Sequence, residues 1–372
     1  MPGPTGLRVA LDATSLLGVR TGVGQVTAQL LESLAARGNV ELTAYAVTWK
    51  GRRDLARSLP PGIEAATAPI PARLTRVLWP RVPRPRIERW TGPVDVVHAT
   101  NYVAPPSRAP VLLTIHDLTF VRFPEMCTPD TLTYPRLIRA AVERGAIVHV
   151  FSDFIAGEVR DFFGVPADRV VCIAPGIGPT EHGDAARGRA LAGAERYVLT
   201  LGTIEPRKNL PALVRAFDRV AVDDPSVALV VAGPDGWGVE ELTAALRAAS
   251  HPDRITRLGY QDDEHRRDLL AGAAVLGYPS VYEGFGHPPL EAMRAGVPVV
   301  ASDAGALPEV LGDAALLPDP GDIDAIADAL AGALHDTKVR GELIARGHER
   351  VDRYTWDRAA DQFVSVYETL AR

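Results

Sequence analysis

The sequence predicts an α/β protein built from two doubly wound, parallel-sheet domains that face each other across a cleft. Its 372 residues exceed the usual size of a single core, so the length favours about two domains. Short apolar runs alternate with helix-length amphipathic segments, which is typical of parallel sheets covered by helices. A Gly-, Pro- and Ala-rich stretch at 175–196 separates two such series. The expected domains are therefore 1–180 and 190–355.

The composition is that of a soluble enzyme. Hydrophobic residues make up 47% of the chain, charged residues make up 23%, and the mean hydropathy is +0.02, so there is apolar material for two cores. Arg8 and Asp12 interrupt the first apolar run before a secretory segment could form, and later runs have only strand length. We therefore expect a cytoplasmic protein. Cys127 and Cys172 lack C-x-x-C spacing, so neither a disulfide framework nor a cysteine metal site is indicated.

Charge is divided unevenly along the chain. The net charge is −6, but residues 1–180 hold 20 Lys and Arg against 15 Asp and Glu, and the remainder holds 20 against 31. The two parts thus carry +5 and −11. This asymmetry is compatible with an anionic partner for the basic part, and equally with solvated surface.

A proline-punctuated stretch at 59–93 combines arginines with apolar and aromatic residues. These are Arg73, Arg76, Arg81, Arg84, Arg86 and Arg89, interleaved with Leu74, Val77, Leu78, Trp79 and Trp90. One interpretation is a solvated loop and short helix. The other is contact of 73–90 with an anionic acceptor or a membrane surface, with Trp79 and Trp90 at the interface. Nucleic acid is disfavoured as a partner, because no nucleic-acid-binding motif accompanies the arginines.

A strand–helix unit with glycines at its turn opens the chain. The strand is predicted at 8–14 and the helix at about 23–37. Gly22 and Gly24 partly match the G-x-G-x-x-G motif of dinucleotide-binding proteins. That interpretation fails because several residues separate the strand from the glycines. In addition, the next strand, 41–48, is followed by Trp49 and Lys50, where a ribose-binding acid is required. We therefore expect no nicotinamide cofactor.

Two further strands, 95–101 and 111–117, carry polar residues at their carboxyl ends, where open parallel sheets bind ligands. His116 is one of these residues. A histidine there is often a satisfied structural residue, and the alternative is a place beside the substrate. The series continues with a helix at 131–144, a strand at 147–152, a helix at 154–163 and a strand at 170–174.

The second series begins with a strand at 197–201, a turn and a helix at 211–220. Arg207 and Lys208 lie at that turn, beside a helix N-terminus. Arginine offers a fork of donors and lysine a point charge, so the pair suits a diphosphate; a solvated pair is the alternative. Later elements are strands at 229–235 and 255–260, a helix at 262–271 and a strand at 274–279.

The stretch 280–303 is predicted to form a strand end, a loop, a helix and the next strand. Glu283 stands in the loop and Glu291 in the helix. Two prolines suit the first helical turn and a glycine suits its C-terminal cap, so backbone N–H groups in the loop would face hydroxyls or phosphates above the sheet. Those groups belong to Phe285, Gly286 and His287. The alternative is a tight turn followed by a glutamate that is merely favourable to the helix dipole.

The pattern Gly321-Asp-Ile-Asp324 raises the question of a D-x-D metal site. The two aspartates directly precede an apolar-periodic helix at 325–334, and they fit its N-cap and first turn better. We therefore expect no metal ligands in this chain.

The segment 283–291 resembles the E-G-F-G-x-P-x-L-E signature of retaining glycosyltransferases with the GT-B fold, the large family-four group. The resemblance implies that Glu291 hydrogen-bonds the ribose of a sugar nucleotide, and that Glu283 and the loop amides hold the transferred sugar. The segment 202–210 resembles the family's G-x-x-x-x-R-K-N element, whose Arg and Lys grip the donor phosphates. Nearly the whole chain is covered by the resemblance.

The same resemblance assigns other parts of the site. Gly22 and Gly24 would let the backbone approach the donor diphosphate, and Tyr260 would belong to the nucleobase pocket. His116 begins a segment similar to the H-D-L of mannosyltransferase-like members, which implies a position near the sugar. The chain departs from the family at Pro175-Gly-Ile-Gly178, where an Asn-Gly turn is usual, and at His287, where an apolar residue is common. The helix 356–372 is expected to pack back on the N-terminal domain.

The resemblance implies transfer of a sugar with retention, best matched by mannose from GDP-mannose, to a hydroxyl acceptor. The expected catalytic residues are Arg207, Lys208, Glu283 and His116. The donor, GDP- or UDP-linked, would be a substrate, and no separate cofactor is expected. The acceptor would be a glycan, a glycolipid or a small molecule. If 73–90 contacts a membrane from the cytoplasmic side, the acceptor would be anionic or lipid-linked. The alternatives are a sugar-nucleotide epimerase or hydrolase, and a non-catalytic sugar-nucleotide-binding protein.

Overall fold

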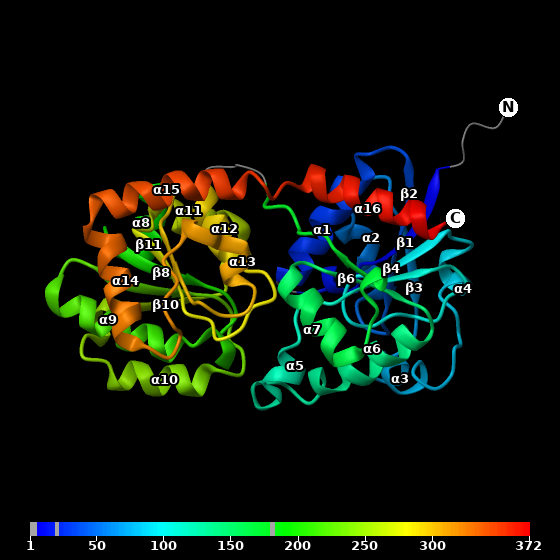
Figure 1. Ribbon diagram of the computed structural model, residues 1–372, viewed down its shortest axis with the longest axis horizontal. Coiled ribbons are helices and arrows are strands. Elements are labelled where there is room, and N and C mark those ends of the chain that lie inside the picture. Colours follow the sequence, from blue (N-terminus) through cyan, green and yellow to red (C-terminus); the bar gives the residue numbers. More distant parts are fainter. Residues whose placement is uncertain (1–5, 19–21, 179–182) are drawn as a thin grey trace. The chain divides into compact units, whose positions relative to one another are not determined.

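Two compact units make up the chain in the computed structural model, which describes residues 6–18, 22–178 and 183–372 (Figure 1). Unit 1 comprises Met1–Gly176 and Tyr354–Arg372, and unit 2 comprises Ile177–Arg353. The chain therefore passes from one unit to the other twice. Each unit has a parallel sheet covered by helices, which is the α/β class that the alternating sequence pattern predicts.

Unit 1 is built on a parallel sheet that has seven strands within the described residues, in the order β3-β2-β1-β4-β5-β6-β7. Its strands are β1 (Leu7–Asp12), β2 (Val40–Val47), β3 (Glu64–Ala68), β4 (Val96–Ala99), β5 (Val111–Thr114), β6 (Ile147–Val150) and β7 (Val170–Cys172). Its helices are α1 (Gly22–Ala35), α2 (Leu55–Ser58), α3 (Ala72–Leu78), α4 (Glu88–Thr91), α5 (Thr119–Arg122), α6 (Tyr134–Glu143), α7 (Asp153–Phe163) and α16 (Trp356–Leu370). Short 3-10 helices are η1 (Thr14–Leu16), η2 (Arg52–Asp54), η3 (Pro124–Met126), η4 (Thr131–Thr133) and η5 (Ala167–Arg169).

The sheet of unit 1 is buried on both faces. Successive residues of a strand point to opposite sides of the sheet, so neighbours in one strand belong to different cores. Leu11 of β1 belongs to a core that includes Phe363 of α16. Ala10, its neighbour in β1, belongs to a second core with Trp79. Helix α16 packs against α1, and Nε of Arg37, just beyond α1, donates to Asp361 across 2.7 Å (Figure 1). The last helix of the chain is thus part of unit 1.

Unit 2 is built on a parallel sheet that has five strands within the described residues, in the order β10-β9-β8-β11-β12. Its strands are β8 (Tyr197–Leu201), β9 (Ala228–Ala232), β10 (Ile255–Gly259), β11 (Val275–Tyr278) and β12 (Val299–Ala301). Its helices are α8 (Ala185–Ala192), α9 (Leu210–Asp223), α10 (Val239–Ala248), α11 (Asp263–Gly272), α12 (His287–Arg294), α13 (Leu307–Leu311), α14 (Ile323–His335) and α15 (Thr337–Val351). Its 3-10 helices are η6 (Pro206–Lys208), η7 (Pro252–Arg254) and η8 (Gly312–Ala314).

The Gly- and Ala-rich stretch 175–196 contains helix α8, which sequence reasoning did not identify. Asp184 caps this helix, because its carboxylate accepts hydrogen bonds from the backbone N–H groups of the first turn. Helix α8 packs against α11 so closely that a Cβ on Gly188 would lie 1.9 Å from the carbonyl oxygen of Asp268. Unit 2 therefore begins upstream of residue 190.

The arginine-rich stretch carries an exposed apolar ridge on α3 and the turn after it. The ridge consists of Leu74, Val77, Leu78 and Val82, which are 38% to 49% exposed. Trp79 lies on the opposite side, is 3% exposed and packs in the core. The expectation that Trp79 sits at a membrane interface is therefore wrong, because the helix turns that side chain inward; Trp90 is also partly buried against the same core.

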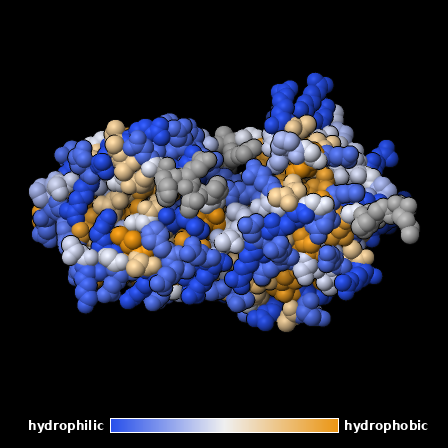
Figure 2. Space-filling model, turned by 90° about the horizontal axis from the view of Figure 1, so that it is seen from above, coloured by the Kyte–Doolittle hydropathy of each residue, from blue (hydrophilic) through white to orange (hydrophobic). Residues whose placement is uncertain are grey.

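The surface is mixed in character. The face in Figure 2 is largely hydrophilic, and hydrophobic residues occur on it in scattered patches. None of the helices among the described residues combines the length and the apolar character that crossing a bilayer requires.

Candidate active site

Two strand-to-helix turns meet at the carboxyl edge of the unit 2 sheet. One follows β8 and contains η6, and the other follows β11 and leads into α12. Strands β8 and β11 are neighbours, and the backbone N–H of Val281 donates to the carbonyl oxygen of Arg207 across 2.8 Å. The sheet extends to β9 and β10 on one side and to β12 on the other, so this edge is the topological switch point where open sheets bind ligands.

Glu283 lies between two cations at this switch point. Its Oε2 is 2.7 Å from Nη1 of Arg207, and its Oε1 is 2.6 Å from Nζ of Lys208. Burial alone would raise the pKa of Glu283, but the charges of Arg207 and Lys208 outweigh burial and bring it to about 2. The structure thus brings three of the four expected catalytic residues into one network, with Glu283 ionised at neutral pH.

Further polar groups hold the two cations in place. Nε of Arg207 donates to Oε2 of Glu205 across 2.9 Å, and Nζ of Lys208 donates to the hydroxyl of Tyr278. The pKa of Lys208 is lowered by burial and by the charge of Arg207, while Glu283 acts in the opposite direction. Because two carboxylates face two cations, the cluster is nearly neutral overall, and its donors are fixed before a ligand arrives.

Glu291 belongs to a different ion pair. Nη2 of Arg266, on α11, lies 2.5 Å from Oε2 of Glu291, whose side chain is 25% exposed. The charge of Glu291 is the main reason that the pKa of Arg266 is raised. Tyr260 directly follows β10, which is an edge strand of the unit 2 sheet, and it is 52% exposed. The two glutamates therefore differ in partner and in exposure.

The loop before α12 is held by its own packing. Phe285 is 5% exposed, and its ring lies 5.2 Å from that of His287, the first residue of α12. Gly286 has φ +106°, a left-handed conformation that favours glycine, and a Cβ there would lie 2.6 Å from Leu307. The backbone N–H of Ala306 donates to the carbonyl oxygen of Glu283 across 2.9 Å. The loop is thus clamped between α12 and α13.

His116, the fourth expected catalytic residue, belongs to unit 1 and lies just beyond β5. Its Nε2 is 2.8 Å from the carbonyl oxygen of Thr100, which can only accept, so Nε2 carries the proton and Nδ1 is the acceptor. Burial is the main cause that lowers the pKa of His116. Its ring packs on Phe151, with 5.1 Å between ring centroids. His116 is therefore a neutral imidazole held in one orientation.

The glycines of the first strand–helix unit occupy the first turn of α1 rather than a loop that precedes the helix. Gly22 is the first residue of α1 and is exposed, while Gly24 is buried. A Cβ on Gly22 would meet no atom within 4 Å. Thr21, which the sequence places before them, lies outside the described residues. The two glycines therefore lie in the first helical turn, and their approach to a donor diphosphate stays a prediction.

The two aspartates of the D-x-D pattern have structural partners. Asp322 caps α14, because its carboxylate accepts a hydrogen bond from the backbone N–H of Ala325 across 3.0 Å. Asp324 forms an ion pair with Arg219. In the part of the chain that the structure describes, His, Cys, Asp and Glu side chains form no cluster of three or more that could hold a metal ion.

Sequence reasoning missed three residues that hold the site together. Tyr278 ends β11, and the rule that strand ends carry ligand-binding polar groups could have singled it out. Glu205 stands two residues before Arg207, in the turn that follows β8. Arg266 lies 25 residues before its partner Glu291, and no sequence signal links the two.

Solved structures share this architecture along nearly the whole chain. Sucrose-phosphate synthase from Thermosynechococcus elongatus superposes with a TM-score of 0.79 and 22% identity over 98% of this chain and 99% of that one. WaaG, a glycosyltransferase involved in lipopolysaccharide biosynthesis, gives a TM-score of 0.75 and 18% identity over 95% and 98%. With two parallel-sheet units, these likenesses identify the fold as GT-B.

Sequence comparisons identify the family within that fold class. The model described as Glycosyltransferase Family 4 matches residues 20–181, and that of Glycosyl transferases group 1 matches residues 185–350. O-antigen chain mannosyltransferase B of Escherichia coli is 33% identical over 284 residues, 74% of either chain. Phosphatidyl-myo-inositol mannosyltransferase of Mycobacterium tuberculosis is 30% identical over 379 residues, 98% of this chain and 97% of that one. The chain belongs to the family-four glycosyltransferases and is similar to their mannosyltransferases.

Proposed function

We propose that the protein is a retaining, metal-independent mannosyltransferase whose donor is a nucleotide-linked mannose, with GDP-mannose as the best candidate. The observation that carries the proposal is the network of Arg207, Lys208 and Glu283 at the switch point of unit 2. The sugar is inferred from relatives that are named mannosyltransferases. No separate cofactor takes part, because the leaving nucleoside diphosphate comes with the donor itself.

In this proposal, different residues of unit 2 bind different parts of the donor. Arg207 and Lys208 face the diphosphate, where buried, preorganised cations stabilise the negative charge that develops on the leaving group. Glu291 receives the ribose hydroxyls, and the exposed ring of Tyr260 meets the nucleobase. Glu283 holds hydroxyls of the transferred sugar, together with the backbone N–H groups of the clamped loop. The loop groups are those of Phe285, Gly286 and His287.

The chemical step exchanges one bond at the anomeric carbon of the donor. The bond from this carbon to the diphosphate oxygen breaks, and a bond to the acceptor oxygen forms on the same face. The acceptor proton passes to a phosphate oxygen of the leaving group, so no protein carboxylate has to act as a nucleophile. His116, a neutral imidazole with Nδ1 as acceptor, would receive a hydrogen bond from a sugar hydroxyl.

The acceptor is proposed to be the hydroxyl of a glycan or glycolipid, presented at an anionic membrane surface. Support comes from the ridge of α3, where exposed Leu74, Val77 and Leu78 stand beside the exposed arginines Arg73 and Arg81. An apolar ridge flanked by basic residues is the pattern of a segment that lies in a membrane interface. The contact is thus assigned to leucine and valine side chains, with Trp79 as the internal anchor of the helix.

A donor-consumption assay with and without acceptor tests the proposed function. A thermal-shift panel of nucleotide sugars first selects the donor, because a ligand that binds the folded state raises its melting temperature. Transfer that requires the acceptor supports the proposal. Binding without turnover would instead indicate a sugar-nucleotide sensor, and isomerised or hydrolysed donor without acceptor would indicate an epimerase or hydrolase.

A further inference from the structure

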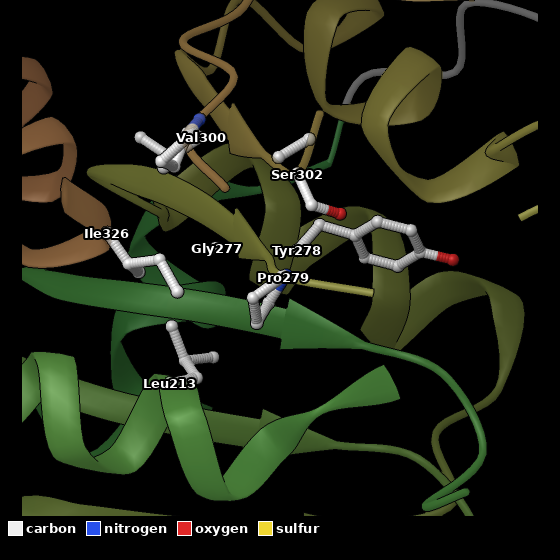
Figure 3. Close-up of a pocket in the computed structure, with 9 residues that line it drawn as sticks. Leu213, Gly277, Tyr278, Pro279, Val300, Ser302 and Ile326 are labelled. Carbon is white, nitrogen blue, oxygen red and sulfur yellow. The ribbon is translucent and has the colours of Figure 1, made fainter. Parts of the chain in front are cut away.

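Tyr278 is a buried phenol whose hydroxyl reaches the cationic network. It ends β11, is 2% exposed, and accepts a hydrogen bond from Nζ of Lys208. Figure 3 shows that its ring extends from the strand end away from the apolar pocket lined by Leu213, Val300 and Ile326, with the hydroxyl at the far end. The ring of Tyr278 is therefore buried in unit 2, and its hydroxyl oxygen contacts Nζ of Lys208.

Within the described residues, Nζ of Lys208 has two hydrogen-bond acceptors, which leaves one N–H for a ligand. A lysine ammonium has three N–H donors. One donates to the hydroxyl of Tyr278 and one to Oε1 of Glu283 across 2.6 Å. An ammonium group rotates about its last carbon–nitrogen bond, and two fixed acceptors remove that freedom. The third N–H then points in a direction that the protein sets before any ligand binds.

The neutrality of Tyr278 distinguishes it from Glu283. Burial raises the pKa of Tyr278 well above its ordinary value, so the phenol keeps its proton at physiological pH. A neutral oxygen can replace water around the ammonium without cancelling its charge, whereas a carboxylate both holds the ammonium and neutralises it. Lys208 therefore receives one partner of each kind, and its charge remains available to a phosphate.

We propose that Tyr278 is a positioning residue, which together with Glu283 aims the remaining N–H of Lys208 at the leaving diphosphate. The proposal rests on the proposed function for the identity of the ligand. It assigns Tyr278 no contact with the substrate. The alternative is a structural role, in which the buried ring fills space and the hydroxyl merely finds a partner.

Tyr278→Phe separates the two roles, because it keeps the ring and removes only the oxygen. Tyr197→Phe is the matched control: Tyr197 is also fully buried in unit 2, and its hydroxyl donates to the carbonyl oxygen of Leu269 across 2.6 Å, at the opposite end of a neighbouring strand. Both variants remove a buried phenol hydroxyl from its hydrogen-bond partners, so both should lose stability. Only Tyr278→Phe should lower kcat, by about tenfold or more, with a smaller change in KM for the donor.

The pH profile supplies a readout that a structural role would not move. Loss of the hydroxyl removes an acceptor that favours the charged form of Lys208, so its pKa falls further and the alkaline limb of kcat against pH moves to lower pH. Unchanged kcat and an unchanged alkaline limb in Tyr278→Phe, with stability reduced as in Tyr197→Phe, would overturn the proposal.

A direct titration of Lys208 keeps this test independent of catalysis. The sequence has three lysines, Lys50, Lys208 and Lys338, so selective carbon-13 labelling of lysine gives three assignable resonances. In Tyr278→Phe the Lys208 resonance should titrate at lower pH than in the wild type, while the other two should not move. Identical titration of Lys208 in both proteins would overturn the proposal even if the wild type proved inactive as a transferase, and inactivity with a shifted titration would contradict only the proposed function.

Discussion

The hydroxyl of Tyr367, on the last helix, lies 2.6 Å from Nδ1 of the buried His98 on β4. This hydrogen bond is the last of four that are linked in series, and the first of them determines which group donates in each. Nε2 of His149 donates to the carbonyl oxygen of Ile173, so its Nδ1 accepts from Thr114, which in turn accepts from Nε2 of His98. Nδ1 of His98 is then the acceptor for Tyr367. Both histidines are neutral. Because Nδ1 of His98 is unprotonated, it can accept the hydrogen bond that links α16 to the sheet of unit 1.

Acid should therefore destabilise unit 1. Burial lowers the pKa of His98 well below its ordinary value and that of His149 to about 3, whereas an unfolded histidine titrates near 6.5. As pH falls below about 6.5, these histidines become protonated in the unfolded chain but stay neutral in the folded protein. The free energy of unfolding therefore drops by about 1.4 kcal/mol per pH unit for each histidine. His116, whose pKa is also lowered, adds to this effect.

One buried carboxylate acts in the opposite direction. Burial raises the pKa of Asp12 to about 6, so the fold takes up this proton before the unfolded chain does and gains stability as pH falls. Asp12→Asn should thus steepen the loss of stability between pH 6 and pH 4. Urea unfolding in a Trp237→Phe background measures it, since the tryptophans that remain all belong to unit 1. Equal stability at pH 7.5 and pH 5 would refute the neutral-histidine assignment.

The two glutamates of the donor site should respond differently to neutralisation. Glu291→Gln should weaken binding of the free nucleoside diphosphate by about tenfold, because a charged acceptor for the ribose hydroxyls is lost. Glu283→Gln should leave that affinity unchanged or raise it, since Arg207 and Lys208 lose a neutralising partner, yet slow transfer by about a hundredfold. Calorimetry and initial rates separate the two effects. Equal losses of nucleotide affinity in both variants would contradict the separate roles.

The ridge of α3 should bind anionic membranes through apolar and basic residues together. Serine at Leu74, Val77 and Leu78 should release the protein from anionic vesicles, whereas Val222→Ser, an exposed valine of unit 2, should not. Glutamate at Arg73, Arg81 and Arg84 should weaken binding roughly a hundredfold, at about 1 kcal/mol for each basic residue.

Salt and lipid charge provide the controls for this docking. Surface charges are screened beyond about 10 Å at 0.1 M ionic strength, so co-sedimentation should decline as salt rises. Neutral vesicles should retain little protein. A wild-type protein that pellets equally with neutral and anionic vesicles, or with neither, would return α3 to the solvated-surface interpretation and favour a soluble acceptor.

Activity should survive chelation of divalent ions. Stabilisation of the charge that develops on the leaving diphosphate is assigned to Arg207 and Lys208, whose side chains contact Glu205, Glu283 and Tyr278. Turnover in the presence of EDTA should match turnover with added magnesium. Loss of turnover on chelation and its recovery with a divalent ion would show that the two side chains do not carry this charge alone.

The parts of the site that sequence could predict are those that local rules determine. Arg207 and Lys208 follow a strand and precede a helix, so their place at the carboxyl edge of the sheet depends only on neighbouring residues. The contact of Glu283 with both cations depends on β8 and β11 being adjacent in the sheet, which alternation of strands and helices does not specify. Pairs such as Arg266 and Glu291 arise from the same long-range packing.

Orientation was the other property that sequence did not determine. Along 73–90, arginines alternate with apolar residues on either side of Trp79, so composition gave no reason to prefer one face of the helix as the buried one. The fold decides this through the core that contains Tyr45 and Ile87, which receives Trp79 and leaves Leu74 and Val77 outside. Helix α8 was hidden for a similar reason, because its stability comes from packing on α11.

The most direct test of the account is the rate of sugar transfer by Lys208→Ala, measured in EDTA at saturating donor. Lys338→Ala is its control, since Lys338 is an exposed lysine of the same unit. The buried ammonium of Lys208, held by Tyr278 and Glu283, should be worth roughly a hundredfold or more in kcat, as for other preorganised groups that stabilise developing charge. A fall of that size in Lys208→Ala alone is predicted, and a rate equal to that of Lys338→Ala would contradict the account.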